Sequence, residues 1–207
     1  MLIGACSVLM ALLVVAWRMR RRREAYELDP LPPEMEKLAP VPIRQVTDNR
    51  RVKIVGKLRF VGAPLPAPLS GRPCAFYDVR ASDDNGVIVA SESEGCDFYV
   101  DDGTGRAIIC VSVARVFVKL DARYRSHGRQ VTSRQAAFLE RHHQTPAGPL
   151  RYIEGTLTSG ETVTVVGVPF HEPDLDQRNL DTLRDMPMCL RFEGADLFVT
   201  DDWSATL

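Results

Sequence analysis

Residues 52–60, VKIVGKLRF, alternate apolar and charged side chains with the period of two that is typical of a half-buried strand. The charged positions are Lys53, Lys57 and Arg59. Because successive side chains of a strand point to opposite faces, we expect the apolar face in a core and the charged face in solvent. Shorter segments of the same kind recur through the rest of the chain.

The chain after residue 60 contains many short apolar segments, separated by turns rich in glycine, proline and aspartate. Strands are expected at 74–80, 87–90, 96–100, 107–113, 115–120, 152–157, 162–168, 188–192 and 196–199. Segments 152–157 and 162–168 are interpreted as a strand pair around Ser159-Gly160. One helix is expected at 134–143, capped by Thr132 or Ser133 and ended by the prolines at 146 and 149.

This order of elements predicts a mainly β fold, a small OB-like β-barrel or sandwich with one inserted helix. A single N-terminal transmembrane helix is expected before it. Residues 2–17 contain no charged side chain, and arginines follow at 18 and 20–23. A helix of that length rises about 24 Å, which snorkelling arginines can extend toward the thickness of a bilayer core.

The position of the arginines after the apolar segment predicts that the soluble part lies on the cytoplasmic side of the membrane. Residues 29–42 hold five prolines, a density that favours an extended spacer. The expected organisation is a transmembrane anchor at 1–19, a basic and Pro-rich linker at 20–42 and a β domain at 43–207. The protein is therefore expected to be a single-pass membrane protein that contacts the lipid bilayer through residues 2–17.

Charge and cysteine content give little indication of a reactive site. The net charge is −1, and the acidic stretch 78–102 and the basic stretch 115–141 are interpreted as two solvated faces. The cysteines after Cys6 lack any Cys-x-x-Cys pair, which favours reduced, buried thiols, although a disulfide between Cys74 and Cys96 or between Cys96 and Cys110 stays open.

No catalytic, cofactor or metal site is predicted. His142 and His143 are adjacent, so on a helix they point about 100° apart and do not favour one shared metal ion. Residues 102–105, Asp-Gly-Thr-Gly, are interpreted as a tight hairpin turn. Glu154, on an expected strand, is interpreted as a partly buried acceptor of structural hydrogen bonds.

Three sequence elements occur in a characteristic order behind the apolar segment. They are Pro-Leu-Ser-Gly-x-Pro-Cys-x-x-Tyr at 68–77, Phe-x-x-Asp-Asp-Gly-Thr-Gly at 98–105 and Glu-x-x-Leu-x-x-Gly-x-x-Val-x-Val-x-Gly at 154–167. Together they resemble the GIDE domain, also called the beside-a-membrane domain, of the mitochondrial ubiquitin ligase activator (mitochondrial-anchored protein ligase) and its bacterial relatives. The resemblance covers about residues 51–167. The motif positions are Pro68, Leu69, Gly71, Pro73, Cys74, Tyr77, Phe98, Asp102, Gly103, Gly105, Glu154, Gly160 and Gly167.

The resemblance implies a β-rich domain, whereas the ligase activity of the eukaryotic member belongs to a zinc-binding RING. After Gly167 this chain has one histidine, His171, and one cysteine, Cys189, which cannot supply the ligands of a RING. The expected function is a membrane-anchored, non-catalytic interaction module that binds a protein or peptide partner beside the bilayer. Its partner surface is expected on the Pro-rich loop 64–73 and the basic helix region.

Two alternatives stay open. The first is an E3 ubiquitin-ligase-like transferase, which the resemblance implies and the missing RING opposes. The second is an OB-like nucleic-acid binder, which would need aromatic side chains among the bases of residues 115–141. Only Phe117, Tyr124 and Phe138 are present there, so nucleic acid ranks last among the expected partners.

Overall fold

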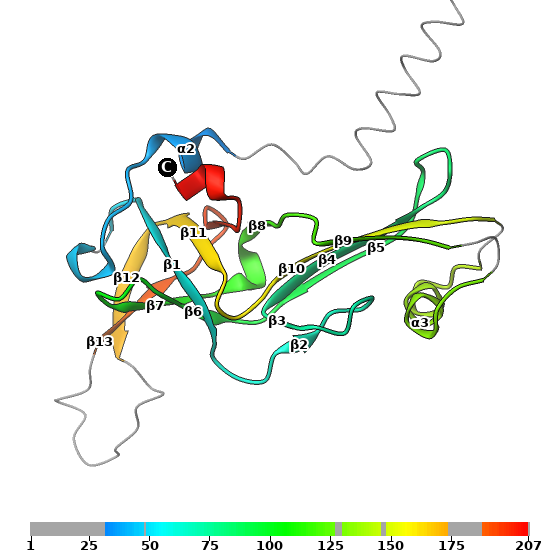
Figure 1. Cartoon of the computed structure of the whole chain (residues 1–207). Helices are drawn as coiled ribbons and strands as arrows, with labels where there is room; N and C mark the ends of the chain where they lie inside the picture. Colours follow the sequence, from blue (N-terminus) through cyan, green and yellow to red (C-terminus); the bar gives the residue numbers. More distant parts are fainter. Residues whose placement is uncertain (1–31, 48, 127–129, 146–147, 174–187, 207) are drawn as a thin grey trace, which may run out of the picture.

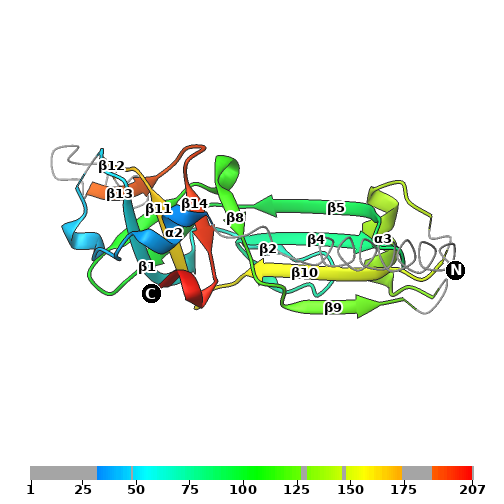
Figure 2. The ribbon, with the colours of Figure 1, turned by 90° about the horizontal axis from the view of Figure 1, so that it is seen from above.

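A computed structural model describes residues 32–47, 49–126, 130–145, 148–173 and 188–206 of the chain (Figure 1). The anchor expected at 1–19 lies outside these residues. No helix within the described ranges is long and apolar enough to cross a membrane. The described chain is mainly β, as expected, and its strands form two large sheets that extend in different directions, together with a two-stranded ribbon (Figures 1 and 2).

The larger sheet has eight strands in the order β12-β13-β7-β6-β1-β11-β14-β8. The central strand β1, Val52–Phe60, pairs antiparallel with β6 and β11. The other strands are β6 Phe98–Asp101, β7 Arg106–Ile109, β8 Arg115–Phe117, β11 Thr162–Gly167, β12 Pro169–Pro173, β13 Met188–Phe192 and β14 Phe198–Thr200. The end strands β12 and β8 are not paired with each other, so the sheet is not a closed barrel.

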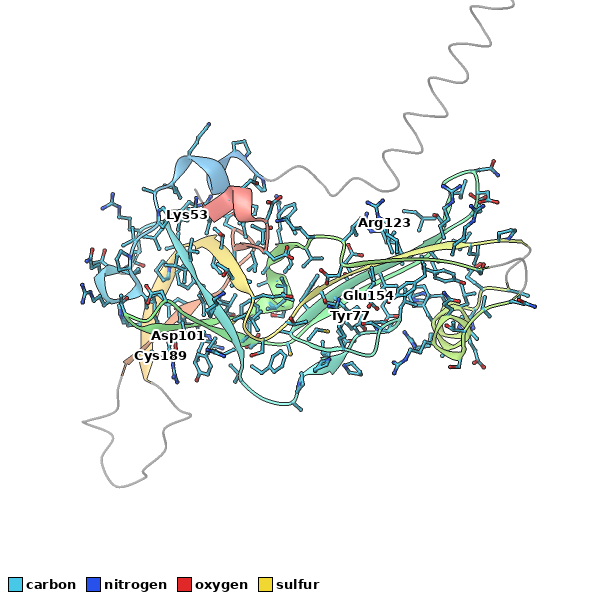
Figure 3. The ribbon with its side chains drawn as sticks, viewed as in Figure 1. Lys53, Tyr77, Asp101, Arg123, Glu154 and Cys189 are labelled. Atoms are coloured by element: carbon cyan, nitrogen blue, oxygen red, sulfur yellow. The ribbon has the colours of Figure 1, made fainter. Side chains whose placement is uncertain are left out.

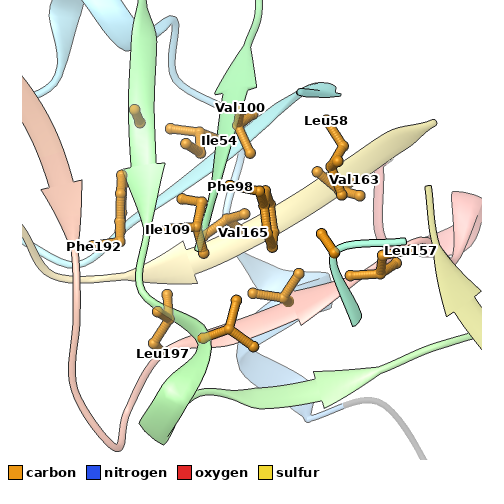
Figure 4. Packing of buried hydrophobic residues seen from close by; sticks show 14 of the residues in the cluster. Ile54, Leu58, Phe98, Val100, Ile109, Leu157, Val163, Val165, Phe192 and Leu197 are labelled. Atoms are coloured by element: carbon orange, nitrogen blue, oxygen red, sulfur yellow. The ribbon is translucent and has the colours of Figure 1, made fainter. Parts of the chain in front are cut away.

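The main core lies inside this curled sheet (Figure 4). Ile54 and Leu58, from the apolar face of β1, are fully buried together with Phe98, Ile109 and Val165 from three other strands. The alternation that identified β1 in the sequence is therefore the pattern that fills this core.

The smaller sheet has four antiparallel strands in the order β5-β4-β10-β9. Its strands are β4 Phe76–Ser82, β5 Ile88–Gly95, β9 Ala122–Arg125 and β10 Arg151–Leu157. One face is covered by helix α3, Ser133–Arg141, and by the ribbon of β2, Leu65–Pro66, and β3, Pro73–Cys74 (Figure 1). A second core lies between them, with Val79, Phe138 and Tyr152 fully buried.

The inserted helix α3 begins where the sequence indicated. The Thr132 hydroxyl accepts a hydrogen bond from the Gln135 backbone at 3.2 Å, and the Gln135 side chain accepts one from the Thr132 backbone at 2.9 Å. This reciprocal pair is a capping box, which satisfies two amides that the first helical turn leaves without partners. The predicted cap at Thr132 is confirmed.

The predicted pairing of segments 152–157 and 162–168 is wrong, although both segments are strands. They are β10 and β11, and they lie in different sheets. The turn between them is tied to β1, because Gly160, at φ +92°, donates to the Leu58 carbonyl at 2.9 Å and Glu161 accepts from the Leu58 amide at 2.9 Å. The chain therefore crosses from one sheet to the other at this turn.

The solvent exposure expected for Lys53 is also wrong. Helix α2, Pro33–Lys37, and the 3₁₀ helix η4, Trp203–Thr206, pack together against β11, with Met35 and Ala205 fully buried. Lys53 is fully buried as well, and its Nζ has no hydrogen-bond partner among the described residues. Burial lowers the pKa of this amine.

Candidate functional site

The motif positions divide between the two sheets. The motif positions of the first element, together with Glu154, lie on the covered face of the four-stranded sheet, in the β2–β3 ribbon, or in the loop between β2 and β3. Those in the eight-stranded sheet or its turns are Phe98, Asp102, Gly103, Gly105, Gly160 and Gly167. The structure therefore joins the first and third elements but leaves the second in another part of the fold.

Glu154 connects the first and third elements. Its side chain is fully buried, and its carboxylate accepts hydrogen bonds from the Leu69 amide at 2.7 Å and the Ser70 amide at 3.1 Å. A buried carboxylate that accepts from backbone amides is stabilised without a neighbouring cation. The interpretation of Glu154 as a structural acceptor is confirmed, and its burial is complete rather than partial.

A second set of contacts holds the same loop. Arg72 donates to the Asp121 carboxylate at 2.9 Å and to the Thr156 hydroxyl at 3.1 Å, and Asp121 also accepts from the Thr156 backbone at 2.9 Å. Gly71 adopts φ +74°, and a Cβ placed on it would lie 2.3 Å from the Arg134 guanidinium of α3. The loop and the basic helix are therefore in contact, which brings together the two regions expected to form a partner surface.

Tyr77 is the centre of a polar cluster between β5 and the end of α3. Its hydroxyl lies 2.5 Å from a Glu92 oxygen and 2.7 Å from a Glu94 oxygen, and it is buried (Figure 3). Glu92 is also contacted by Arg141 at 3.1 Å and by His142 Nε2 at 2.9 Å. Burial raises the pKa of the Tyr77 hydroxyl, and its bonds to the two carboxylates raise it further.

The contacts of this cluster fit a structural role better than a catalytic one. Burial acts to raise the pKa of Glu92, but hydrogen bonds from Tyr77, His142 and Arg141 outweigh burial and hold the pKa below its usual value. Because its pKa is raised, the Tyr77 hydroxyl stays protonated at neutral pH and is not available as a base. The contacts of His142 in the described chain include no serine or cysteine nucleophile. The arrangement ties α3 to β5.

The turn at 102–105 is a hairpin connection, as predicted, and it also holds an N-terminal segment. Gly103 has φ +81°, and the Asp102 carboxylate accepts from the amides of Thr104 at 2.7 Å and Gly105 at 3.0 Å. Asp102 also accepts from the Ile43 amide at 2.8 Å, where the 3₁₀ helix η1, Ile43–Gln45, begins. Burial acts to raise the pKa of Asp102, but these hydrogen bonds lower it overall.

The remaining motif positions have packing roles. Phe98 is fully buried in the main core, and a Cβ on Gly167 would lie 3.0 Å from Leu197. Pro68 lies in the loop between β2 and β3, and Pro73 begins β3. Cys74 is fully buried, and burial with the nearby Glu154 raises the pKa of its thiol to about 12. Such a thiol is protonated at neutral pH and unreactive.

Metal ligands do not gather in the described part of the chain. Cys74, Cys96, Cys110 and Cys189 form no disulfide with one another, and the described residues contain no group of three or more side chains placed to hold a metal ion. Cys189 lies on β13 and His171 on the adjacent β12. The described residues thus offer no set of zinc ligands like that of a RING.

Sequence reasoning missed a basic cluster on the uncovered face of the four-stranded sheet. It consists of Arg80 from β4, Arg123 and Arg125 from β9, and Arg151 from β10. Arg80 stands in an acidic stretch and Arg151 beyond the basic one, so the pattern along the chain does not show the cluster. Strand register would have revealed it, because Ile153 pairs with both Arg80 and Arg123.

Comparison of the chain with protein-family models, curated proteins and solved structures found no match.

Proposed function

We propose that this protein is a membrane-anchored, non-catalytic interaction module, related to the GIDE domain, that binds a protein or peptide partner beside the bilayer. The apolar segment 2–17 with its following arginines supports the anchor and the cytoplasmic placement of the domain. The hydrogen bonds of Glu154, Tyr77 and Asp102 support the non-catalytic role, because each of these groups is engaged in holding loops or helices in place.

The free edge of β5 is the observation that carries the binding role. This eight-residue strand pairs with β4 on one side, and no described strand pairs with its other side. An edge of this length presents unpaired amides and carbonyls, and an extended peptide can add to it as another strand. Val87 and Ile88 are 53% and 46% exposed at the start of the strand, and Glu94 is exposed near its end.

These side chains indicate the partner's chemistry. An extended segment with an apolar residue near Ile88 and a basic residue near Glu94 would complement the edge. The contact between the Pro-rich loop and α3 lies on the covered face of the same sheet, so a larger partner could reach both regions. The covered face and the edge together define the proposed partner surface.

The test compares two lysine variants of the full-length protein, Ile88→Lys on the β5 edge and Val168→Lys as the control. Val168 is 41% exposed, comparable to Ile88, but lies in the eight-stranded sheet region. Partners are captured by cross-linking in native membranes and quantified by mass spectrometry. We expect at least one partner to be reduced about tenfold or more by Ile88→Lys, which corresponds to about 1.4 kcal/mol, and retained by Val168→Lys.

Equal capture by both variants would contradict binding at the β5 edge. The transferase alternative is checked in parallel, by adding the wild-type protein to a ubiquitin-transfer reaction. We expect no stimulation, and a clear acceleration would favour that alternative over the interaction module.

A further inference from the structure

The face of the four-stranded sheet opposite α3 and the β2–β3 ribbon, called here the open face, carries the four arginines described above. Side chains alternate along a strand, so Arg123, Arg125, Arg151 and Ile153 project from the face opposite Glu154. In Figure 3 Arg123 lies above the sheet, and Tyr77 and Glu154 lie on its other side. A hollow of about 330 Å³ lies along the two strands, lined by Arg123, Tyr124, Arg125, Arg151, Tyr152 and Ile153.

Positive charge exceeds negative charge on this face. Asp78 pairs with Arg80 at 2.7 Å, and Asp84 is shared by Arg125 at 3.0 Å and Arg151 at 3.5 Å. Arg123 is exposed and forms no ion pair within the described residues. Four guanidinium groups therefore face two paired carboxylates, and the open face attracts anions.

The open face lies on the same side of the molecule as α2, near the start of the described chain (Figure 1). Figure 1 shows α2, near the start of the described chain, above the curled sheet, while α3 and the ribbon lie on the lower side of the other sheet. Residues 18–31 separate the apolar segment from this point, and fully extended they span at most about 50 Å. A bilayer that holds residues 2–17 is therefore within reach of the open face.

We infer that the open face docks on an anionic bilayer surface and orients the domain, leaving α3, the ribbon and their loop turned away from the lipid. This inference rests on the proposed membrane anchor. A bilayer fits the face better than nucleic acid does, because Tyr124 and Tyr152, the aromatic residues of the hollow, project toward the opposite face and cannot stack on bases there. Arginines that face acidic headgroups need no such stacking.

The test measures how closely the domain approaches the lipid. Full-length protein carrying Ser93→Cys is labelled with a donor dye and mixed with acceptor-labelled vesicles of phosphatidylcholine alone or with phosphatidylglycerol. Ser93 is exposed and pairs with Asp78, which places it on the open face, on the edge strand opposite the one that carries Arg123 and Arg125. Labelling of protein without this substitution measures the background from Cys96, which is partly exposed.

We expect energy transfer to be higher with phosphatidylglycerol present. The increase should disappear in about 1 M salt, where the Debye length falls to about 3 Å. It should also disappear in the double variant Arg123→Gln/Arg125→Gln and persist in the matched control Arg59→Gln/Arg106→Gln. These control arginines are exposed on the eight-stranded sheet. If the labelled protein inserts into both kinds of vesicle but the energy transfer is the same with and without phosphatidylglycerol, the inference is overturned.

The same experiment separates the docking face from the anchor. If the protein binds only vesicles that contain phosphatidylglycerol, and only when Arg123 and Arg125 are present, the result would support docking through the open face and refute the membrane anchor. Protein that binds neither vesicle would refute both. If Arg123 and Arg125 are needed to bind a single-stranded oligonucleotide probe while lipid composition has no effect, the face is a nucleic-acid surface and the inference fails.

Discussion

The carboxylate of Glu154 accepts the backbone N–H of Leu69 at 2.7 Å, across 85 residues of sequence. Glu154 lies on β10, and Leu69 belongs to the loop between β2 and β3. This one acceptor fixes the path of a loop that also contacts α3 through Gly71 and Arg134. The position of the loop on the sheet therefore depends on the buried carboxyl group of Glu154.

The first prediction is that Glu154→Gln destabilises the protein by about 1–3 kcal/mol. A glutamine carbonyl in the place of Oε2 keeps the Leu69 bond and the longer contact with Ser70 at 3.3 Å, but the NH₂ group in the place of Oε1 then faces the Ser70 N–H, which is also a donor. Urea unfolding of the full-length protein in detergent measures the loss. Glu140→Gln, an exposed change on α3, is the control and should shift stability by less than about 0.5 kcal/mol. Equal stability of both variants would contradict the role assigned to Glu154.

The second prediction compares two buried tyrosines that should respond in opposite directions. Tyr77→Phe removes the donor that serves Glu92 and Glu94, and should cost about 1–3 kcal/mol. Tyr152→Phe removes a buried hydroxyl without a partner in the described chain, and should be neutral or stabilising by up to about 1 kcal/mol. Thermal unfolding of the two variants distinguishes them, and a larger loss from Tyr152→Phe would show that its hydroxyl has a partner.

Local patterns predicted most of the strands and the helix, but not how the strands pair. The alternation of β1 and the cap of α3 depend on neighbouring residues, so the sequence shows them directly. Strands β10 and β11 are close in sequence yet lie in different sheets, because Gly160 and Glu161 bind β1 instead of closing a hairpin. Long-range contacts of this kind have no local signature.

The candidate site shows the same limit. Glu154 was identified because an acid on an apolar strand needs a donor when it is buried, but its partners, 84 and 85 residues away, could not be named. The burial of Lys53 was missed because Val166, its partner across β1 and β11, packs against Met35 of α2 and Ala205 of η4, which come from near the two ends of the described chain. The open face was missed because its arginines are neighbours across strands and not along the chain.

The third prediction concerns the turn before β7. Gly103→Val should destabilise by about 1–3 kcal/mol through backbone strain alone, since φ is +81° and a Cβ there meets nothing within 4 Å. Gly105→Ala should act differently, because its Cβ would lie 2.9 Å from Ile43 Cγ2 and displace η1. Hydrogen exchange should therefore increase at residues 43–46 in Gly105→Ala. Thr104→Ala should be nearly silent, because both contacts of its hydroxyl, with the Arg44 amide at 3.3 Å and with the Asp102 carboxylate at 2.8 Å, are exposed.

The fourth prediction concerns Asp201, whose carboxylate accepts from the Lys119 amide at 2.8 Å where β14 meets β8. Burial raises the pKa of Asp201 to about 6, with smaller contributions from Glu161 and Asp121, against the lowering effect of the Lys119 amide. The unfolded chain has the ordinary value near 3.9. Between these two pKa values the folded protein holds a proton that the unfolded chain has released, so stability declines as pH rises toward about 6.

Asp201→Asn removes this titration and keeps a carbonyl that can accept from the Lys119 amide. Below about pH 4 the variant and the wild type should have the same free energy of unfolding, because Asp201 is then protonated in both the folded and the unfolded chain. Above pH 6 the variant should be more stable by about 1–3 kcal/mol. Urea unfolding of both proteins at a series of pH values gives the difference curve, in which the contributions of the other carboxylates cancel. A difference that is constant with pH would mean that Asp201 titrates at its ordinary value and that its burial does not oppose ionisation.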